Sequence, residues 1–107
     1  MNMEQTFKNE PFALLEKKFK ALADQKRLEI LQLICRHQTV CVGDLSEMIN
    51  MPQSKLSYHL KILLDAEFIL KESKGTWSYY SFNKKEMHQL LSEELCGLFQ
   101  SRCSEEK

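Results

Sequence analysis

Apolar residues recur at helical spacing in four successive segments between residues 10 and 66. The first covers residues 10–23, and the second begins after Asp24, which is suited to capping it. A short β-like stretch at 39–42 leads into a two-turn helix that ends near residue 51. The fourth segment, residues 52–66, gathers its leucines on one stripe. The last two segments predict a short helix, a turn and a longer amphipathic helix.

After residue 66 the pattern changes. Residues 68–71 and 77–82 are rich in aromatic and β-favouring side chains and flank the turn sequence Ser73-Lys-Gly-Thr76. Helical spacing returns at residue 84 and continues toward 103, with Gly97 as a possible stop. This order predicts a mainly α protein with a small β-hairpin wing, the winged helix-turn-helix fold class.

Composition limits the classes of protein that the chain can represent. Its 107 residues fit one domain over 1–107, with residues 1–9 as a disordered arm. Lys plus Arg and Asp plus Glu number 15 each, so total charge neither favours nor excludes nucleic acid. The start lacks the pattern of a signal peptide, and no window approaches the roughly 18 apolar residues of a membrane span. We therefore expect a cytoplasmic protein with no membrane partner.

The chain carries no recognisable catalytic constellation. A Ser-His-Asp set, a Gly-rich phosphate loop and paired acids in a plausible pocket are all missing from the sequence. His59 has no second histidine or carboxylate at ligand spacing beside it, which favours a hydrogen-bonded structural imidazole. We expect that the protein is not an enzyme.

Polar side chains cover the outward side of segment 52–66 at its N-terminal end, the part of a recognition helix that reaches base edges. A glutamine pairs bidentately with adenine, hydroxyl groups bond to phosphates or bases, and lysines release counterions. The alternative is a solvated helix face without a partner. The candidate DNA contacts on this segment are Gln53, Ser54, Lys55, Ser57, Tyr58 and Lys61.

The tip of the hairpin supplies two more candidate DNA contacts, Lys74 and Thr76, which suit phosphates or the minor groove. A turn that merely needs Gly75 explains the same residues. The aromatic residues beside the tip are expected to pack within the hairpin and the core, because bases of duplex DNA stay stacked and offer no face to them. These residues are Trp77, Tyr79 and Tyr80.

Four segments carry a family resemblance: Lys20-Ala-Leu-Ala-Asp-Gln-Lys-Arg-Leu-Glu-Ile-Leu31, Cys41-Val-Gly-Asp-Leu45, Gln53-Ser-Lys-Leu-Ser-Tyr-His-Leu60 and Lys74-Gly-Thr-Trp-Ser-Tyr-Tyr80. With them the chain resembles the ArsR/SmtB family of bacterial metal- and metalloid-responsive repressors over roughly residues 19–91. The resemblance implies a homodimer that binds a palindromic operator in double-stranded DNA and is released by an inducer. Segments 10–23 and 84–103 carry more apolar surface than a monomer of this size hides easily, which fits dimerisation helices.

The resemblance also bears on the inducer. Cys41 occupies the first position of the family's arsenic motif Cys-Val-Cys-Asp-Leu, but Gly43 replaces the second cysteine. The family's zinc-type site is absent, because His88 is the only histidine after His59. Some arsenic-responsive relatives carry ligand cysteines near the C-terminus. The resemblance thus implies a thiophilic ion such as arsenite, antimonite or cadmium as inducer, with no cofactor required for DNA binding and these metal-ligand candidates: Cys41, Cys96 and Cys103.

Several alternatives remain open for these thiols. A straight helix holds Cys96 and Cys103 about 10.5 Å apart, whereas thiolates that share one ion lie about 3.5–4 Å apart. A shared site therefore requires either a folded-back tail or a partner subunit. A dithiol or persulfide switch explains the same residues, and a repressor without cysteine sensing is a further alternative. Cys35 is expected in the core. Outside repressors, the alternative is a winged-helix protein-interaction module.

Overall fold

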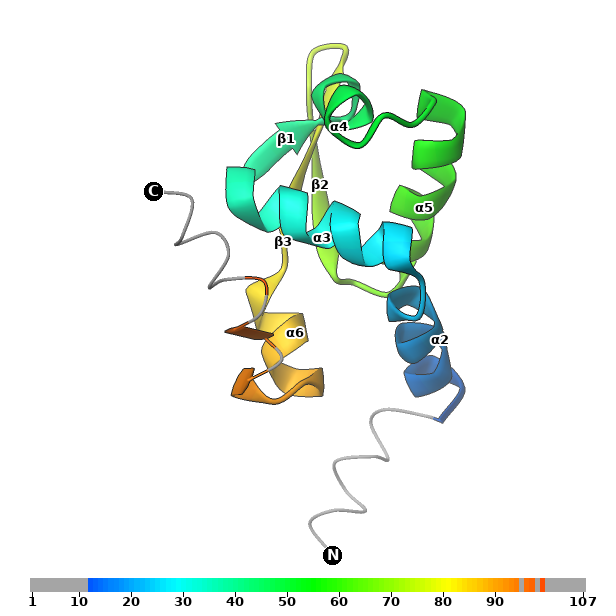
Figure 1. Ribbon diagram of the computed structural model, residues 1–107, viewed down its shortest axis with the longest axis vertical. Helices are drawn as coiled ribbons and strands as arrows, with labels where there is room; N and C mark the ends of the chain where they lie inside the picture. Colours follow the sequence, from blue (N-terminus) through cyan, green and yellow to red (C-terminus); the bar gives the residue numbers. More distant parts are fainter. Residues whose placement is uncertain (1–11, 95, 98, 100–107) are drawn as a thin grey trace, which may run out of the picture.

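The computed structural model describes residues 12–94, 96, 97 and 99. Five helices and three strands span the continuous part (Figure 1). No helix within the described residues is both long enough and apolar enough to cross a membrane. In chain order the elements are α2 (Phe12–Leu22), α3 (Gln25–His37), β1 (Thr39–Cys41), α4 (Val42–Ile49), α5 (Gln53–Asp65), β2 (Ile69–Lys74), β3 (Trp77–Phe82) and α6 (Lys84–Leu90).

The strands form one antiparallel sheet in the order β1-β3-β2. The predicted hairpin is present, with Lys74 opposite Trp77 and Gly75 at φ 65° in the turn, a conformation that glycine adopts without strain. The short stretch before α4 joins as a third strand, which pairs Val40 with Tyr80. This arrangement of helices and sheet confirms the predicted winged helix-turn-helix fold.

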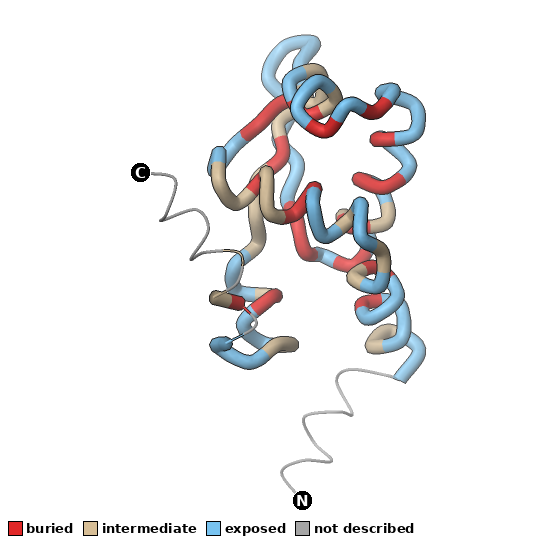
Figure 2. The backbone as a smooth tube through the Cα atoms, viewed as in Figure 1, coloured by how far each residue is buried: buried red, intermediate tan, exposed pale blue. Residues whose placement is uncertain are grey.

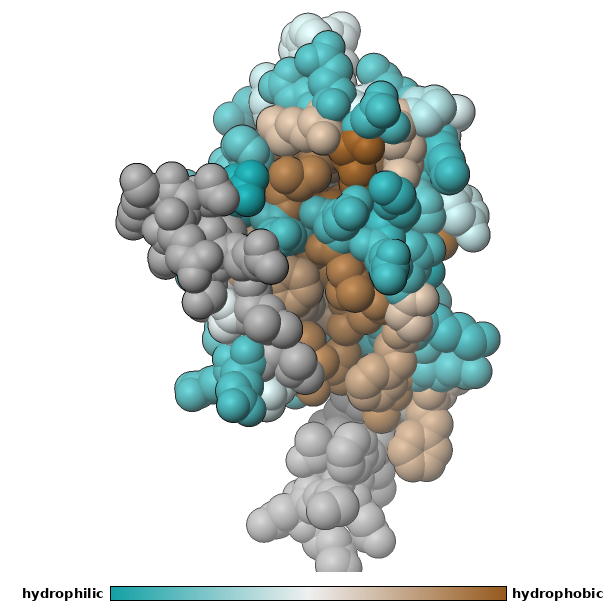
Figure 3. All heavy atoms as spheres, in the orientation of Figure 1, coloured by the Kyte–Doolittle hydropathy of each residue, from teal (hydrophilic) through white to brown (hydrophobic). Residues whose placement is uncertain are grey.

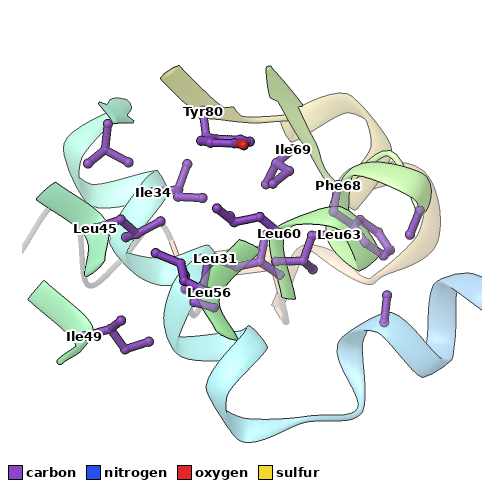
Figure 4. Close-up of a cluster of buried hydrophobic side chains, with 14 of the residues drawn as sticks. Leu31, Ile34, Leu45, Ile49, Leu56, Leu60, Leu63, Phe68, Ile69 and Tyr80 are labelled. Atoms are coloured by element: carbon purple, nitrogen blue, oxygen red, sulfur yellow. The ribbon is translucent and has the colours of Figure 1, made fainter. Parts of the chain in front are cut away.

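The core lies where α3, α4 and α5 meet the sheet (Figures 2 and 4). The helical stripe of α5 contributes Leu56, Leu60 and Leu63, each at most 1% exposed. Full burial of such a side chain stabilises the fold by about 1.5–3 kcal/mol. Because α5 is fixed along this stripe, its opposite side must face solvent.

The connection between α4 and α5 is a tight turn. Asn50 ends α4 in the left-handed conformation at φ 56°, ψ 56°, which asparagine tolerates better than most residues. The Ser46 hydroxyl donates to the Met51 carbonyl, and the Met51 side chain is 6% exposed. The backbone N–H of Leu56 then donates to the Pro52 carbonyl at 2.9 Å, which starts α5. These contacts fix the angle at which α5 leaves the turn.

The C-terminal part differs from the predicted single helix over 84–103. Helix α6 ends at Leu90, and Leu91 has an extended backbone with φ −112° and ψ 156°. Residues 93, 94, 96, 97 and 99 are helical again, and the Cys96 N–H donates to the Ser92 carbonyl at 3.0 Å. The helical segment is therefore interrupted at Leu91 and Ser92, earlier than the stop predicted near Gly97. The predicted arm at 1–9 and the end of that helix at 100–103 lie outside the described residues.

Helices α2 and α6 lie toward the end of the molecule opposite the hairpin tip (Figure 1). An ion pair between Lys18 of α2 and Glu86 of α6 joins them. The Lys18 residue is 2% exposed, an unusual position for a lysine, which is almost never fully buried unless it is paired. This ion pair therefore links the first described helix to the last one.

Candidate nucleic-acid interface

Helix α5 presents a polar face to solvent along its N-terminal two-thirds. All six predicted contacts on this helix are exposed, and Tyr58 is 63% exposed. They alternate along the helix with the buried residues of the core stripe, so the helix has two distinct sides. The exposed side of α5 carries these six side chains: Gln53, Ser54, Lys55, Ser57, Tyr58 and Lys61.

The charge of this surface is carried mainly by two lysines. Lys61 pairs with Asp65 one turn later, with Nζ 3.5 Å from the carboxylate, and both side chains are solvated. Such an exposed pair contributes at most about 1 kcal/mol, so a phosphate can compete for Lys61. At the start of the helix, Pro52 makes no side-chain capping bond. Backbone N–H groups at a helix N-terminus attract phosphate, which complements the lysines.

The hairpin tip places its predicted contacts in solvent. Lys74 and Thr76 are exposed, and the Lys74 ammonium lies 5.8 Å from the ring centroid of Tyr79. Tyr80 is buried as predicted, whereas Trp77 is 57% exposed, so it belongs to the hairpin but does not pack in the core. Trp77 pairs with Lys74 at the free end of the hairpin, beyond the reach of the core.

The tip and the start of α5 belong to the same end of the molecule (Figure 1). Helix α4 contacts both α5 and β3, and so connects the two regions. At Gly43 of α4, an added Cβ would lie 4.0 Å from the Gln53 side-chain nitrogen, an ordinary contact distance. A side chain at position 43 would therefore fit, so lack of space does not explain why the motif at 41–45 has no second cysteine.

His59 confirms the expectation of a structural imidazole. It is 6% exposed on α5, and its Nδ1 lies 3.1 Å from Nη1 of Arg27. Burial lowers the pKa of His59; the Asp24 carboxylate opposes this shift, while the Arg27 and Lys55 cations add to it. Sequence reasoning missed Arg27, because no local pattern links it to a residue 32 positions later.

Asp24 caps α3 as predicted, and its carboxylate accepts from the backbone N–H of Lys26 at 2.8 Å and of Arg27 at 3.4 Å. Burial raises the pKa of Asp24, but these bonds and the Arg27 and His59 charges outweigh that effect, so its pKa is lowered. The carboxylate therefore stays ionised beside the Arg27 guanidinium.

The candidate thiol ligands have different surroundings. Cys41 is buried at the end of β1, and Cys96 is 3% exposed, with its thiol donating to the Met87 carbonyl at 3.4 Å. Cys96 therefore lies in the core rather than at the surface. Burial raises the pKa of Cys96, and Glu93 raises it further. Cys103 lies outside the described residues, within which no group of three or more His, Cys, Asp or Glu is placed to hold a metal.

Cys35, expected in the core, is half-buried on α3, and its thiol lies 3.9 Å from the Phe99 carbonyl. The contact brings α3 close to the segment that follows α6. Its surroundings are those of a packing residue rather than of a ligand cluster.

Apolar side chains are also exposed on the other end of the molecule. Phe12 is 78% and Phe19 is 53% exposed on α2, and Leu28 is 37% exposed on α3. Brown atoms in Figure 3 form a band that continues from the middle of this face down over α2. A surface of this kind is typical of an interface with another protein.

Comparison with known proteins places this arrangement among bacterial regulators. The model of the arsR family of bacterial regulatory proteins matches residues 24–71. The arsenical resistance operon repressor of Bacillus subtilis (strain 168) is 58% identical over 100 residues, which are 94% of each chain.

Solved structures give the same result for the fold. The AntR antimony-specific transcriptional repressor is 27% identical with a TM-score of 0.61 and covers 84% of this chain and 78% of its own. A homodimeric winged helix-turn-helix DNA-binding domain, Mb0332 from Mycobacterium bovis, is 23% identical with a TM-score of 0.69 and covers 88% and 82%. The second likeness concerns the fold alone.

Proposed function

This chain belongs to the ArsR family of bacterial regulatory proteins, and we propose that it is a homodimeric repressor of a palindromic operator, released by a thiophilic metal or metalloid. The observation that carries the proposal is the exposed polar face of α5, held by a buried leucine stripe next to a tight turn. Its 58% identical relative is a repressor of an arsenical resistance operon, which supports the same class of target. The proposed place of action is the cytoplasm, and no enzymatic step is required.

In this proposal α5 enters the major groove with its N-terminal end. Gln53 reads adenine, the hydroxyls of Ser54, Ser57 and Tyr58 bond to bases or phosphates, and Lys55 and Lys61 neutralise phosphates. Lys74 and Thr76 at the hairpin tip contact the flanking backbone. Two symmetric subunits place their recognition helices about 34 Å apart, so the operator is palindromic.

The proposed dimer interface is formed by the terminal helices. Helix α2 exposes Phe12 and Phe19, and α6 is joined to α2 through the Lys18–Glu86 ion pair. An isologous dimer buries the same patch on both subunits, which suits an apolar face near both ends of the chain. In this arrangement the two α5 helices remain free for DNA, because the hairpin tip and the start of α5 lie at the opposite end.

For the inducer we propose Cys41, Cys96 and Cys103 as ligands, either within one chain or across the dimer. The raised pKa of Cys96 favours a neutral thiol. Arsenite, as As(OH)₃, tolerates a neutral thiol, because each new As–S bond takes the thiol proton away with a departing hydroxide as water. Cadmium requires the thiolate, so its binding must release the proton to solvent. The chemistry of Cys96 therefore favours the metalloids within the proposed inducer class.

The test is fluorescence anisotropy of a duplex from the protein's own promoter region, titrated with reduced protein. We expect tight, salt-sensitive binding that arsenite or antimonite reverses. Cys96→Ser and Cys103→Ser are expected to keep DNA binding and lose the release, while Cys35→Ser is the matched control that keeps both.

Each other outcome has a definite meaning. Release only by a persulfide donor would replace the metalloid sensor with a thiol switch. Binding that no thiophile reverses would remove the cysteines from the account. Absence of duplex binding would contradict the repressor itself and favour a protein-interaction module.

A further inference from the structure

Arg27 holds the end of α2 to the start of α3. Its Nε donates to the Ala21 carbonyl at 2.7 Å, and its Nη2 donates to the Lys20 carbonyl at 3.1 Å. Its Nη1 lies 3.4 Å from the Asp24 carboxylate, which caps α3. The last carbonyl groups of a helix need such donors, and a guanidinium provides several in fixed geometry.

The same guanidinium reaches the recognition helix. Its Nη1 lies 3.1 Å from Nδ1 of His59, which is buried on α5. A guanidinium has donors and no acceptor, so Nδ1 must accept the hydrogen bond. This requires a neutral imidazole with its proton on Nε2, because imidazolium carries a proton on both nitrogens.

His59 is next to the DNA-reading face rather than deep below it. The Tyr58 ring, one of the candidate contacts, meets the His59 ring edge-on, with centroids 5.3 Å apart and planes at 65°. Lys55, another candidate contact, is close enough to influence the His59 pKa. A change in the position of the imidazole therefore reaches two side chains of the reading face.

Contact between α2 and α5 is incomplete beside Arg27. A cleft of about 350 Å³ opens there, lined on α2 by Glu16, Lys17 and Lys20 and on α5 by Ile62 and Asp65. This cleft leaves a gap in the packing between the two helices. The hydrogen bonds of Arg27 therefore contribute more to fixing their relative position than they would in a fully packed contact.

We propose that the Arg27–His59 hydrogen bond is a positioning link that holds the recognition helix in its DNA-reading orientation relative to α2, and that it does so only while His59 is neutral. This inference rests on the proposed DNA-binding function. Arg27 and His59 are positioning residues that act through α5 and Tyr58, with no contact to DNA required of them.

Protonation of His59 removes the acceptor and sets an imidazolium against the guanidinium. The charged and titratable groups that face His59 are Asp24 and Arg27 from α3 and Lys55 and Tyr58 from α5 itself, while α2 contributes backbone carbonyls to Arg27. Since the pKa of His59 is lowered from 6.5, the link is intact above that pH. It is lost as the pH falls through the lowered pKa, and operator affinity falls with it.

Two substitutions separate the hydrogen bond from the bulk of the side chain. Asparagine places an amide oxygen near the position of Nδ1 and does not titrate, so His59→Asn keeps the acceptor. His59→Leu fills similar space without any acceptor. Anisotropy is measured from pH 7.5 to 5.0 on the promoter duplex and on a scrambled duplex of equal length. The ratio of the two affinities removes the general effect of an added positive charge on phosphate binding.

For the wild type we expect this ratio to fall as the pH falls below 6.5. For His59→Leu we expect it to be about tenfold lower already at pH 7.5, as loss of a charge-assisted bond implies. His59→Asn should stay within about threefold of the wild type at pH 7.5 and show no acid loss. Thermal melting at pH 7.5 and at pH 5.0 identifies a variant that fails to fold. If His59→Leu fails to fold, the pH dependence of the affinity ratio of His59→Asn tests the inference by itself.

An acid loss in His59→Asn equal to that of the wild type would overturn the inference, as would a wild-type ratio that does not change with pH. Failure of the wild type to bind any duplex at pH 7.5 would instead contradict the proposed function. The two failures are therefore distinguishable.

Discussion

The two ends of this protein place their polar groups in opposite ways. At the proposed DNA-reading end, which comprises the start of α5 and the hairpin tip, glutamine, serine and lysine side chains are exposed to solvent, apart from the core. At the terminal end, the Lys18–Glu86 pair is buried between α2 and α6, while Phe12 and Phe19 are exposed. Polar groups therefore support the fold at the terminal end and are available to a partner at the other end.

From this difference we expect substitutions at the two ends to affect different properties of the protein. At the reading end they should change DNA affinity and leave the free energy of unfolding nearly constant, because exposed side chains contribute little to stability. At the terminal end they should act on stability first. Three pairs of variants test this division, and a fourth pair tests the turn that precedes α5.

Glu86→Ala is expected to have the largest effect. It removes the carboxylate that pairs with buried Lys18, and breaking a buried ion pair costs about 3 kcal/mol of unfolding free energy. Glu16→Ala is the matched control, since it breaks an exposed pair with Lys20 on the same α2 helix and should cost less than about 0.5 kcal/mol. Urea denaturation measures both, and equal losses would contradict the distinction.

Gln53→Ala should weaken operator binding by about 1–3 kcal/mol, because an adenine contact is lost. Its unfolding free energy should stay within about 0.5 kcal/mol of the wild type, since Gln53 is exposed. Gln89→Ala, an exposed glutamine on α6, should change neither quantity. If Gln89→Ala weakens binding as much as Gln53→Ala, then α5 is not the specific reader.

Lys55→Ala should act through phosphate neutralisation rather than base reading. The slope of log affinity against log salt concentration should become shallower by about 0.9, as expected for one phosphate contact. Lys85→Ala, an exposed lysine on α6, is the control and should leave the slope unchanged. Anisotropy titrations at four salt concentrations give the slopes, and equal changes in both variants would remove Lys55 from the interface.

Asn50→Ala should have the smallest effect, about 0.5 kcal/mol of lost stability, because alanine adopts the left-handed conformation less readily than asparagine. Asn50→Gly should be close to neutral, since glycine reaches this conformation without strain. Thermal melting of the two variants gives the difference. A larger loss for the glycine variant would show that the Asn50 side chain, rather than its backbone, maintains the turn.

Sequence reasoning succeeded where local patterns determine the structure. The leucine stripe of 52–66 predicted α5, and the residues around Gly75 predicted the hairpin, because helix and strand periods are local properties. The exposure of all eight DNA candidates followed from the same periods.

Tertiary contacts could not be predicted, because local sequence patterns do not contain them. The break at Leu91 was missed because apolar spacing continues through it, although Ser92 followed by Glu93 and Glu94 is a helix-start signal. Burial of Lys18 depends on Glu86, 68 residues later, and the Arg27–His59 link joins two helices that are separate in sequence. Long-range pairs of this kind have no periodic signature.

An NMR titration of ¹⁵N-labelled protein with the promoter duplex tests the proposed DNA-binding surface most directly, because it reports each backbone amide separately. We expect the largest shift changes at residues 53–61 and 74–76, with α2 and α6 nearly unchanged. Changes concentrated on α2 and α6, with the start of α5 unaffected, would contradict it.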